Sequence, residues 1–330
     1  MKIMLESLAF IIGTTLMYST PLIFTALGGV ISENSGVINI GLEGMMTMGA
    51  FVGATVAYFT GNPWLAFLAA GLAAALLALL HAVASVTYSA NQVVSGIAIN
   101  FLGPGIALFL SRMFFDGATM TKPIPLGGTM PRPFHNLFIW LSENLSGTAG
   151  RMFESNSVID LIFDQDATVF IALISVFAVW FVLYKTKIGL RIRAVGEHPK
   201  SADTLGINVT KIRYFCVMAS GMFAGFGGAA LSIAIVANFR QTLVSGHGFI
   251  ALAAMIFGKW KPQGAMWACM LFGAANALVV FFGRAASPIQ ISQQLLSMLP
   301  YILTLIVLTG IVGRANAPKA LGVPYEKDSN

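Results

Sequence analysis

Charged residues are scarce in this chain of 330 residues. Lys, Arg, Asp and Glu together make up 10% of it, whereas hydrophobic residues make up 57% and the mean hydropathy is +0.80. Soluble domains carry about 25% charged residues, so a water-soluble core could not hide this much apolar surface. The composition excludes an ordinary soluble protein. It indicates a polytopic, all-α membrane protein with a single transmembrane domain over residues 1–330.

Cysteine and the common catalytic motifs are missing as well. The two cysteines, Cys216 and Cys269, both lie inside apolar runs, so neither a disulfide framework nor a cysteine metal motif is present. The sequence has no phosphate-binding G-x-x-x-x-G-K-S/T loop, no H-E-x-x-H and no G-x-S-x-G. We therefore predict no catalytic residue, metal or cofactor in this chain. If ATP drives the protein, another subunit binds the ATP and Mg²⁺.

Long apolar runs are what the chain has instead. A helix needs about 20 mostly apolar residues to cross a bilayer, and the sequence offers nine such runs, so we predict nine spans within a range of eight to ten. They are 7–30, 38–59, 63–87, 92–115, 167–184, 212–236, 245–258, 264–283 and 296–313. The seventh run is short, which indicates a tilted or partly re-entrant path. Gly103-Pro104-Gly105 predicts a kink or break in the fourth.

The loop charges predict the orientation. Seven Lys or Arg residues lie in or beside loop 185–211 against two acidic ones, whereas loop 116–166 carries three basic and six acidic residues. By the positive-inside rule, 185–211 is cytoplasmic and 116–166 is extracytoplasmic. Counting spans then puts the N-terminus outside and a mobile polar tail, 315–330, inside. Within the outer loop, 134–145 has the pattern of a short amphipathic helix, with an unordered loop as the alternative.

The segment GVINIGLEGMM, residues 36–46, carries polar residues in an apolar run. On a helix, Asn39 and Glu43 are four residues apart and share one face. A carboxylate near the bilayer core costs a few kcal/mol, so Glu43 should face the protein interior. It also falls near the inner end of its span. We therefore assign Glu43 to a gate or to positioning of the second span, rather than to solute contact.

Other polar residues in the spans suit a neutral solute. Asn91, Ser95 and Asn100 present uncharged hydrogen-bonding groups, and with Asn39 they are our candidates for lining a solute path. Hydrogen bonds between helices are the alternative. His81 stands alone and reads as a packing histidine. The glycine pairs Gly49/Gly53 and Gly221/Gly225 have G-x-x-x-G spacing, which predicts close helix packing.

Loop 185–211 contains a second pattern. Gly196 precedes the run EHPKSADTL, which can form a short helix that Gly206 ends. Pro199 fits its first turn, and Glu197 lies near its positive end. Such a helix across the inner face could dock on a partner and transmit motion to the adjacent spans. An ordinary basic loop that only sets topology is an equal alternative.

Several stretches together resemble a known family. They are GVINIGLEGMMTMGAF (36–51), PWLAFLAAGLAAALLALLHAVASV (63–86), ANQVVSGIAIN (90–100), GLRIRAVGEHPKSADTLGI (189–207), SGMFAGFGGAAL (220–231) and GFIALAAMIFGKWKPQGA (248–265). They look like the permease subunits of nucleoside-type ABC importers, in the broad group that also holds ribose and branched-chain amino-acid permeases. The match covers about 20–100 and 189–313.

The resemblance implies a type II importer-like bundle in a bacterial cell membrane that translocates nucleosides, purine nucleosides foremost. It implies three partners: a second, different permease, a cytoplasmic ATPase and an extracytoplasmic substrate-binding lipoprotein. It also implies that the ATPase docks on the loop through Gly196, Glu197, His198, Pro199, Ala202 and Gly206. Alternatives are a permease for ribose or another simple sugar, an ion-coupled transporter and a scaffold without transport. Intramembrane carboxylates nearly confined to Glu43 give ion coupling little support.

Overall fold

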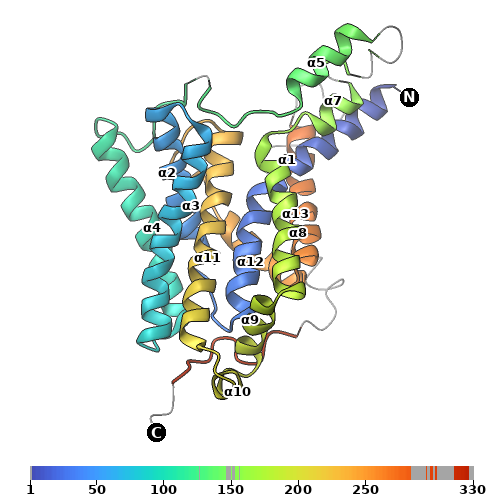
Figure 1. Cartoon of the computed structure of the whole chain (residues 1–330). Coiled ribbons are helices and arrows are strands. Elements are labelled where there is room, and N and C mark those ends of the chain that lie inside the picture. Colours follow the sequence, from blue (N-terminus) through green and yellow to red (C-terminus); the bar gives the residue numbers. More distant parts are fainter. Residues whose placement is uncertain are drawn as a thin grey trace.

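The chain forms a bundle of long helices (Figure 1). The computed structural model describes residues 2–125, 127–145, 150, 153–155, 157–283 and 316–326, together with residues 295, 298, 299 and 302. Within these ranges the chain is helical apart from loops and one isolated β-bridge, between Met120 and Arg240. The predicted ninth span, 296–313, lies almost wholly outside the described residues, so the count of nine spans is not confirmed.

Six helices of the described part are long and apolar enough to cross a bilayer. They are α1 (Lys2–Asn34), α3 (Pro63–Ala82), α4 (Gln92–Phe114), α8 (Ala167–Lys185), α11 (Val209–Ala229) and α13 (Pro262–Phe282). The π-helical turns η1 (Val83–Thr87) and η2 (Ala230–Ile235) continue α3 and α11. The predicted second and seventh spans become α2 (Leu42–Thr60) and the short α12 (His247–Phe257).

Of the kink or break predicted in the fourth span, the break is wrong. Helix α4 runs without interruption from Gln92 to Phe114 with Pro104 inside it. The neighbouring glycine serves helix contact instead: a Cβ on Gly103 would lie 2.3 Å from the carbonyl oxygen of Gly44. Gly103 therefore lets α4 approach the backbone of α2, and the helix tolerates the proline because neighbouring groups can satisfy the freed backbone.

Helix α11 packs against α1, α2 and α3 in the middle of the bundle (Figure 1). A Cβ on Gly49 of α2 would lie 2.4 Å from the Cα of Gly225, and a Cβ on Gly221 would lie 2.4 Å from the Cβ of Ala78. The approach is looser at Gly53, where a Cβ would lie 3.3 Å from the Cβ of Ala229. Small residues thus let three backbones approach closely where lipid offers no hydrophobic drive for association.

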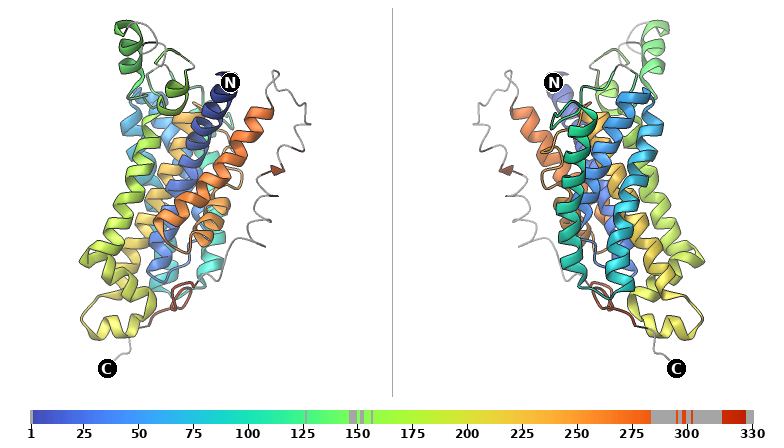
Figure 2. Two further views of the ribbon diagram at one scale, coloured as in Figure 1. Left: turned by 90° about the vertical axis from the view of Figure 1, so that its right-hand side faces the viewer. Right: turned by 90° about the vertical axis from the view of Figure 1, so that its left-hand side faces the viewer.

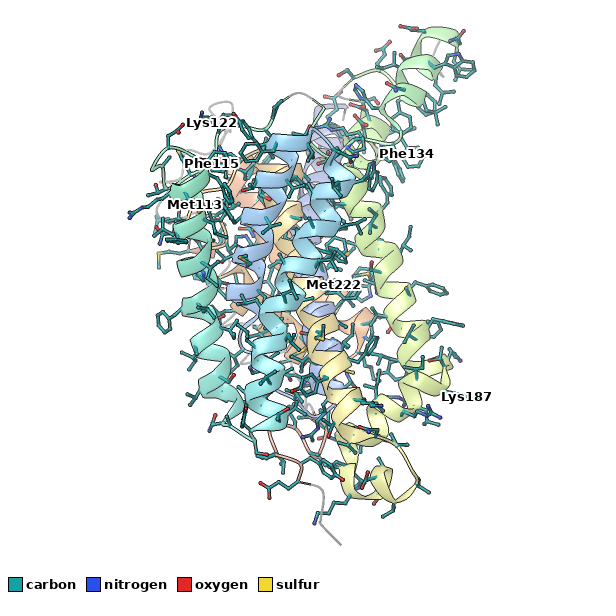
Figure 3. All side chains as sticks on the ribbon, turned by 60° about the vertical axis from the view of Figure 1, so that its left-hand side comes forward. Met113, Phe115, Lys122, Phe134, Lys187 and Met222 are labelled. Carbon is teal, nitrogen blue, oxygen red and sulfur yellow. The ribbon has the colours of Figure 1, made fainter. Side chains whose placement is uncertain are left out.

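Four of the short helices lie at opposite ends of the bundle. Helices α5 (His135–Asn144) and α7 (Val158–Phe163) lie at the end that holds the N-terminus, and α5 occupies the stretch where the amphipathic pattern predicted a helix. Helices α9 (Lys187–Glu197) and α10 (Pro199–Thr204) lie at the other end (Figures 1 and 2). Figure 3 shows the same division, with Lys122 and Phe115 at one end and Lys187 at the other.

Residues 316–326 of the tail lie across the α9–α10 end of the bundle (Figure 2). The amide of Ala320 donates to the carbonyl of Gly196 (2.9 Å), and the amide of Gly322 donates to that of Gly36 (3.1 Å). The buried guanidinium of Arg213 donates to the carbonyl of Val323 (3.1 Å). These bonds hold 320–323 against α9, α11 and the turn after α1, whereas the sequence analysis predicted a mobile tail.

Candidate functional site

The chain is unwound before α2. Gly36 takes a left-handed backbone, with φ +89°, after the end of α1, and helix α2 begins only at Leu42. The prediction that Asn39 and Glu43 share one helical face is therefore wrong. Asn39 precedes the helix and donates to the Ser220 hydroxyl on α11 (2.9 Å), whereas Glu43 points toward α12.

Polar side chains of α3 and α4 satisfy the backbone of this unwound segment. The Ile38 amide donates to Gln92 (2.7 Å), and the Ile38 carbonyl accepts from His81 Nε2 (2.9 Å). Asn100 bridges the start of α2, donating to the Ile40 carbonyl and accepting from the Gly44 amide, both at 2.9 Å. Such partners are necessary because an unpaired backbone group inside a bilayer costs several kcal/mol.

The same bonds account for the other polar candidates. Nε2 of His81 donates to the Ile38 carbonyl and Nδ1 lies 2.9 Å from the Ser95 hydroxyl, so both nitrogens of the buried ring have hydrogen-bond partners. Asn91 caps α4 by accepting from the amides of Val93 and Val94. Asn39 is fully buried, while Ser95 and Asn100 keep part of their surface exposed. That the four asparagine and serine candidates line a solute path stays a prediction.

Helix α12 is too short to cross a bilayer by itself. It has 11 residues, about 16 Å of helix, which agrees with the short seventh run. A non-helical stretch, residues 236–246, leads into it and is called here the entry segment. Its first half pairs with the loop after α4: the Ile124 amide donates to the Ala237 carbonyl (2.9 Å), and the Phe239 amide donates to the Thr121 hydroxyl (2.9 Å).

The entry segment descends into the bundle. Phe239 packs edge-on against Phe51 of α2, with ring centroids 5.4 Å apart, while Gly248 lies against Glu43. Residues 51 and 43 are eight apart, which is about 12 Å along a helix. Asn100, which contacts the start of α2, is likewise eight residues, about 12 Å, into α4. Glu43 thus lies inside the bundle, deeper than its expected place near the inner end.

Glu43 joins α2 to the short helix α12. Its Oε1 accepts from the Gly246 amide (2.6 Å) and its Oε2 from the Gly248 amide (2.7 Å). Hydrogen bonds to an ionised carboxylate are short and roughly twice as strong as neutral ones. Gly248 also leaves no room for a side chain, because a Cβ there would lie 2.6 Å from the Cα of Glu43.

The surroundings of this contact are polar and accessible. Glu43, Gly246 and His247 are half-buried in the chain taken alone, and Arg240, Gln241, Thr242 and Ser245 are exposed. Irregular backbone and polar side chains at this depth do not face lipid; they face protein or a water-filled cavity. Glu43, the entry segment and the first turn of α12 are therefore the candidate site. Sequence reasoning missed residues 240–247, although a short apolar run beside polar residues is a known sign of such a site.

The predicted docking loop folds into a corner between α9 and α10. Pro199 is the first residue of α10, as its missing N–H favours, and Gly206 follows it with φ +78°. Gly196 does not precede the helix; it lies in the last turn of α9, where a Cβ would meet the Asn34 carbonyl oxygen at 2.1 Å. Glu197 and His198 are exposed at the corner. Ala202 is buried beneath it, in a small apolar cluster.

A further polar cluster lies at the other end of the bundle. The Asp164 carboxylate is 2.9 Å from Nδ1 of His135 and 3.4 Å from the Arg132 guanidinium, which also lies 3.7 Å from Asp166. Burial raises the pKa of the Asp166 carboxyl from 3.8 to about 6, against the opposing effect of Arg132. These residues line a cavity of about 420 Å³ beside α1 and α7. Nothing in the sequence analysis singled them out.

Comparison with known proteins identifies relatives over nearly the whole chain. The family described as "Branched-chain amino acid transport system / permease component" matches residues 11–308. The chain is 45% identical over 328 residues to the guanosine ABC transporter permease protein NupQ of Bacillus subtilis (strain 168), covering 98% of both chains. It is 41% identical over 330 residues to the nucleoside ABC transporter permease protein NupC of Lactococcus lactis subsp. cremoris (strain MG1363), again covering 98% of both.

A more distant relative comes from one of the same organisms. The guanosine ABC transporter permease protein NupP of Bacillus subtilis (strain 168) is 23% identical over 278 residues, which covers 80% of this chain and 72% of NupP. Two different permease chains of one bacterium, both named for guanosine, are therefore similar to this chain.

Proposed function

Because the chain belongs to the family of permease components of branched-chain amino acid transport systems, we propose that it is the membrane subunit of an ATP-driven importer of nucleosides, purine nucleosides foremost. The observation that carries this proposal is its identity of 45% and 41%, end to end, to permeases named for guanosine and nucleosides. A neutral solute also agrees with a candidate site rich in hydroxyl and amide groups.

The importer's other subunits supply what this chain lacks. A separate ATPase binds ATP and Mg²⁺ and docks on the α9–α10 corner, where Glu197 and His198 are exposed. The second permease is a different chain, which the similarity to both NupQ and NupP supports. It covers the polar face of the candidate site, which lipid would not cover. An extracytoplasmic lipoprotein delivers solute at the end that carries α5 and α7.

A line of contacts connects the docking corner to the candidate site. Gly196 of α9 lies against the carbonyl of Asn34 at the end of α1. The Asn34 side chain donates to the carbonyl of Trp260 (3.1 Å), in the turn that follows α12. The opposite end of α12, its first turn, binds Glu43. Movement of the ATPase against the corner would therefore shift α12, and Glu43 would hold or release its first turn as a gate or positioning residue.

Reconstitution tests the proposal. The chain, its partner permease, the ATPase and the lipoprotein are placed in proteoliposomes with ATP in the lumen, and uptake of labelled guanosine is measured. We expect uptake that requires hydrolysable ATP, is competed by other nucleosides and survives a protonophore. If ribose inhibited the uptake but other nucleosides did not, the chain would instead be a sugar permease. Uptake that collapses with the protonophore would indicate an ion-coupled transporter, and a complete complex without any uptake would indicate a scaffold.

A further inference from the structure

We propose that Glu43 sets the charge preference of the solute path: its carboxylate neutralises two helix N-termini that meet inside the bundle, so that the path accepts neutral solutes and rejects anions. The inference rests on the proposed function and deepens it. It names phosphorylated nucleosides, and anions generally, as the class that this subunit excludes.

The two helices begin at the same place and run apart. Helix α2 starts at Leu42 and α12 starts at His247. Glu43 is the second residue of α2, and its carboxylate accepts hydrogen bonds from the amides of Gly246 and Gly248 at the start of α12. Each helix N-terminus acts as about half a positive charge. Two of them amount to about one charge, which a single carboxylate cancels.

No other carboxylate belongs to the candidate site. The entry segment and the first turn of α12 read VANFRQTLVSGHGF (236–249), without Asp or Glu. Its one Lys or Arg residue, Arg240, is next to Phe239. Phe239 packs at the level of Phe51, about 12 Å along α2 from Glu43. His247 donates through Nδ1 to the carbonyl of Val244. Glu43 therefore decides the local charge at the point where the helices meet.

Removing that charge should turn the position into an anion site. In Glu43→Gln the amide oxygen can still accept one of the two glycine N–H groups, but the side-chain nitrogen cannot accept the other. One donor and two uncompensated helix N-termini then remain, which is the arrangement that binds sulfate and phosphate elsewhere. In the wild type the same donors are occupied and the carboxylate cancels the charge of the two helix N-termini, so nothing at this position attracts an anion.

Hydrogen exchange of the complete importer, purified without nucleotide, tests this locally. Mass spectrometry follows peptides from 240–250 in sulfate and in chloride of equal ionic strength. We expect the wild type to exchange slowly in both salts. Glu43→Gln should exchange faster in chloride and be slowed about tenfold by sulfate, the change that a gain of 1.4 kcal/mol would give. Glu143→Gln removes an exposed carboxylate from α5 and should behave as wild type.

Transport gives the second readout. Luminal sulfate should inhibit nucleoside uptake by Glu43→Gln at about a tenth of the concentration needed for the wild type, with luminal ATP equal in both. The inference would be overturned if sulfate did not slow hydrogen exchange in Glu43→Gln, or if sulfate slowed exchange equally in the wild type. If the variant is recovered only in sulfate, the inference is supported; loss in both salts counts against it. A wild type that moves no nucleoside would refute the proposed function while leaving the exchange result interpretable.

Discussion

The turn after α12 offers a sharp test of the contact line from the docking corner to the site. Trp260 is 8% exposed, and its indole Nε1–H donates to the carboxylate of Glu33, itself 5% exposed, at 2.5 Å. Trp260→Phe keeps an aromatic ring but leaves that buried acceptor without its donor. Leaving a buried group unsatisfied costs about 1–3 kcal/mol, so we expect the midpoint of thermal unfolding to fall by a few degrees.

Coupling should suffer more than assembly. Because Trp260 holds the end of α12 to the end of α1, we expect Trp260→Phe to keep ATPase co-purification while uptake per ATP hydrolysed falls several-fold. Trp267→Phe is the matched control, since Trp267 on α13 is 66% exposed. The double variant with Glu33→Gln measures the pairwise energy, which should be about 1 kcal/mol or more. Equal stability and equal coupling in the Trp260 and Trp267 variants would refute the reasoning.

Three further predictions follow from single contacts. Gly49→Ala places a methyl group against Gly225 and should lower the yield of folded protein, whereas Gly105→Ala, which meets no atom within 4 Å, should not; equal yields would contradict the packing argument. Ending the chain after residue 318 removes the acceptor of buried Arg213 and should reduce uptake more than ATPase binding, as co-purification and transport will show. Because the pKa of Asp166 is raised in the folded protein, ionising this carboxyl lowers the free energy of unfolding. The loss is absent below about pH 4, grows between about pH 4 and pH 6 and is complete above that range. Melting curves should therefore show the thermal midpoint of Asp166→Asn rising relative to that of the wild type as the pH is raised through this window.

Sequence reasoning succeeded where local chemistry decides the outcome. The long apolar runs became helices because only helices satisfy a backbone in lipid. Pro199 marked the start of a short helix and Gly206 its end, since both residues act through their own backbone. The small residues at Gly49 and Gly225 lie where α2 meets α11, as G-x-x-x-G spacing predicts.

Sequence reasoning failed where residues far away in the sequence determine the local backbone structure. A 3.6-residue period placed Asn39 and Glu43 on one helical face, but the segment is unwound because Gln92, His81 and Asn100 supply its hydrogen bonds. Those residues lie more than 40 positions away, and no local pattern reports them. Sequence reasoning did not identify the entry segment for a related reason. Its backbone is satisfied by Thr121 and its neighbours in another loop, so hydropathy alone showed only a short seventh run.

The polar residues of the spans then acquire a common explanation. A continuous helix needs no side chains to satisfy its backbone, but a helix that starts inside a bilayer does. Around α2 that need is met by the side-chain amides of Gln92 and Asn100 and by His81, none of which brings a negative charge to the positive end of the helix. Glu43, by contrast, brings a carboxylate to this position, where a second helix begins as well. A carboxylate serving only solute contact would not have to bind two backbone amides of α12. One serving only packing would not have to stay half-exposed beside the polar entry segment. Its position fits a residue that holds α2 and α12 together and keeps the path between them neutral.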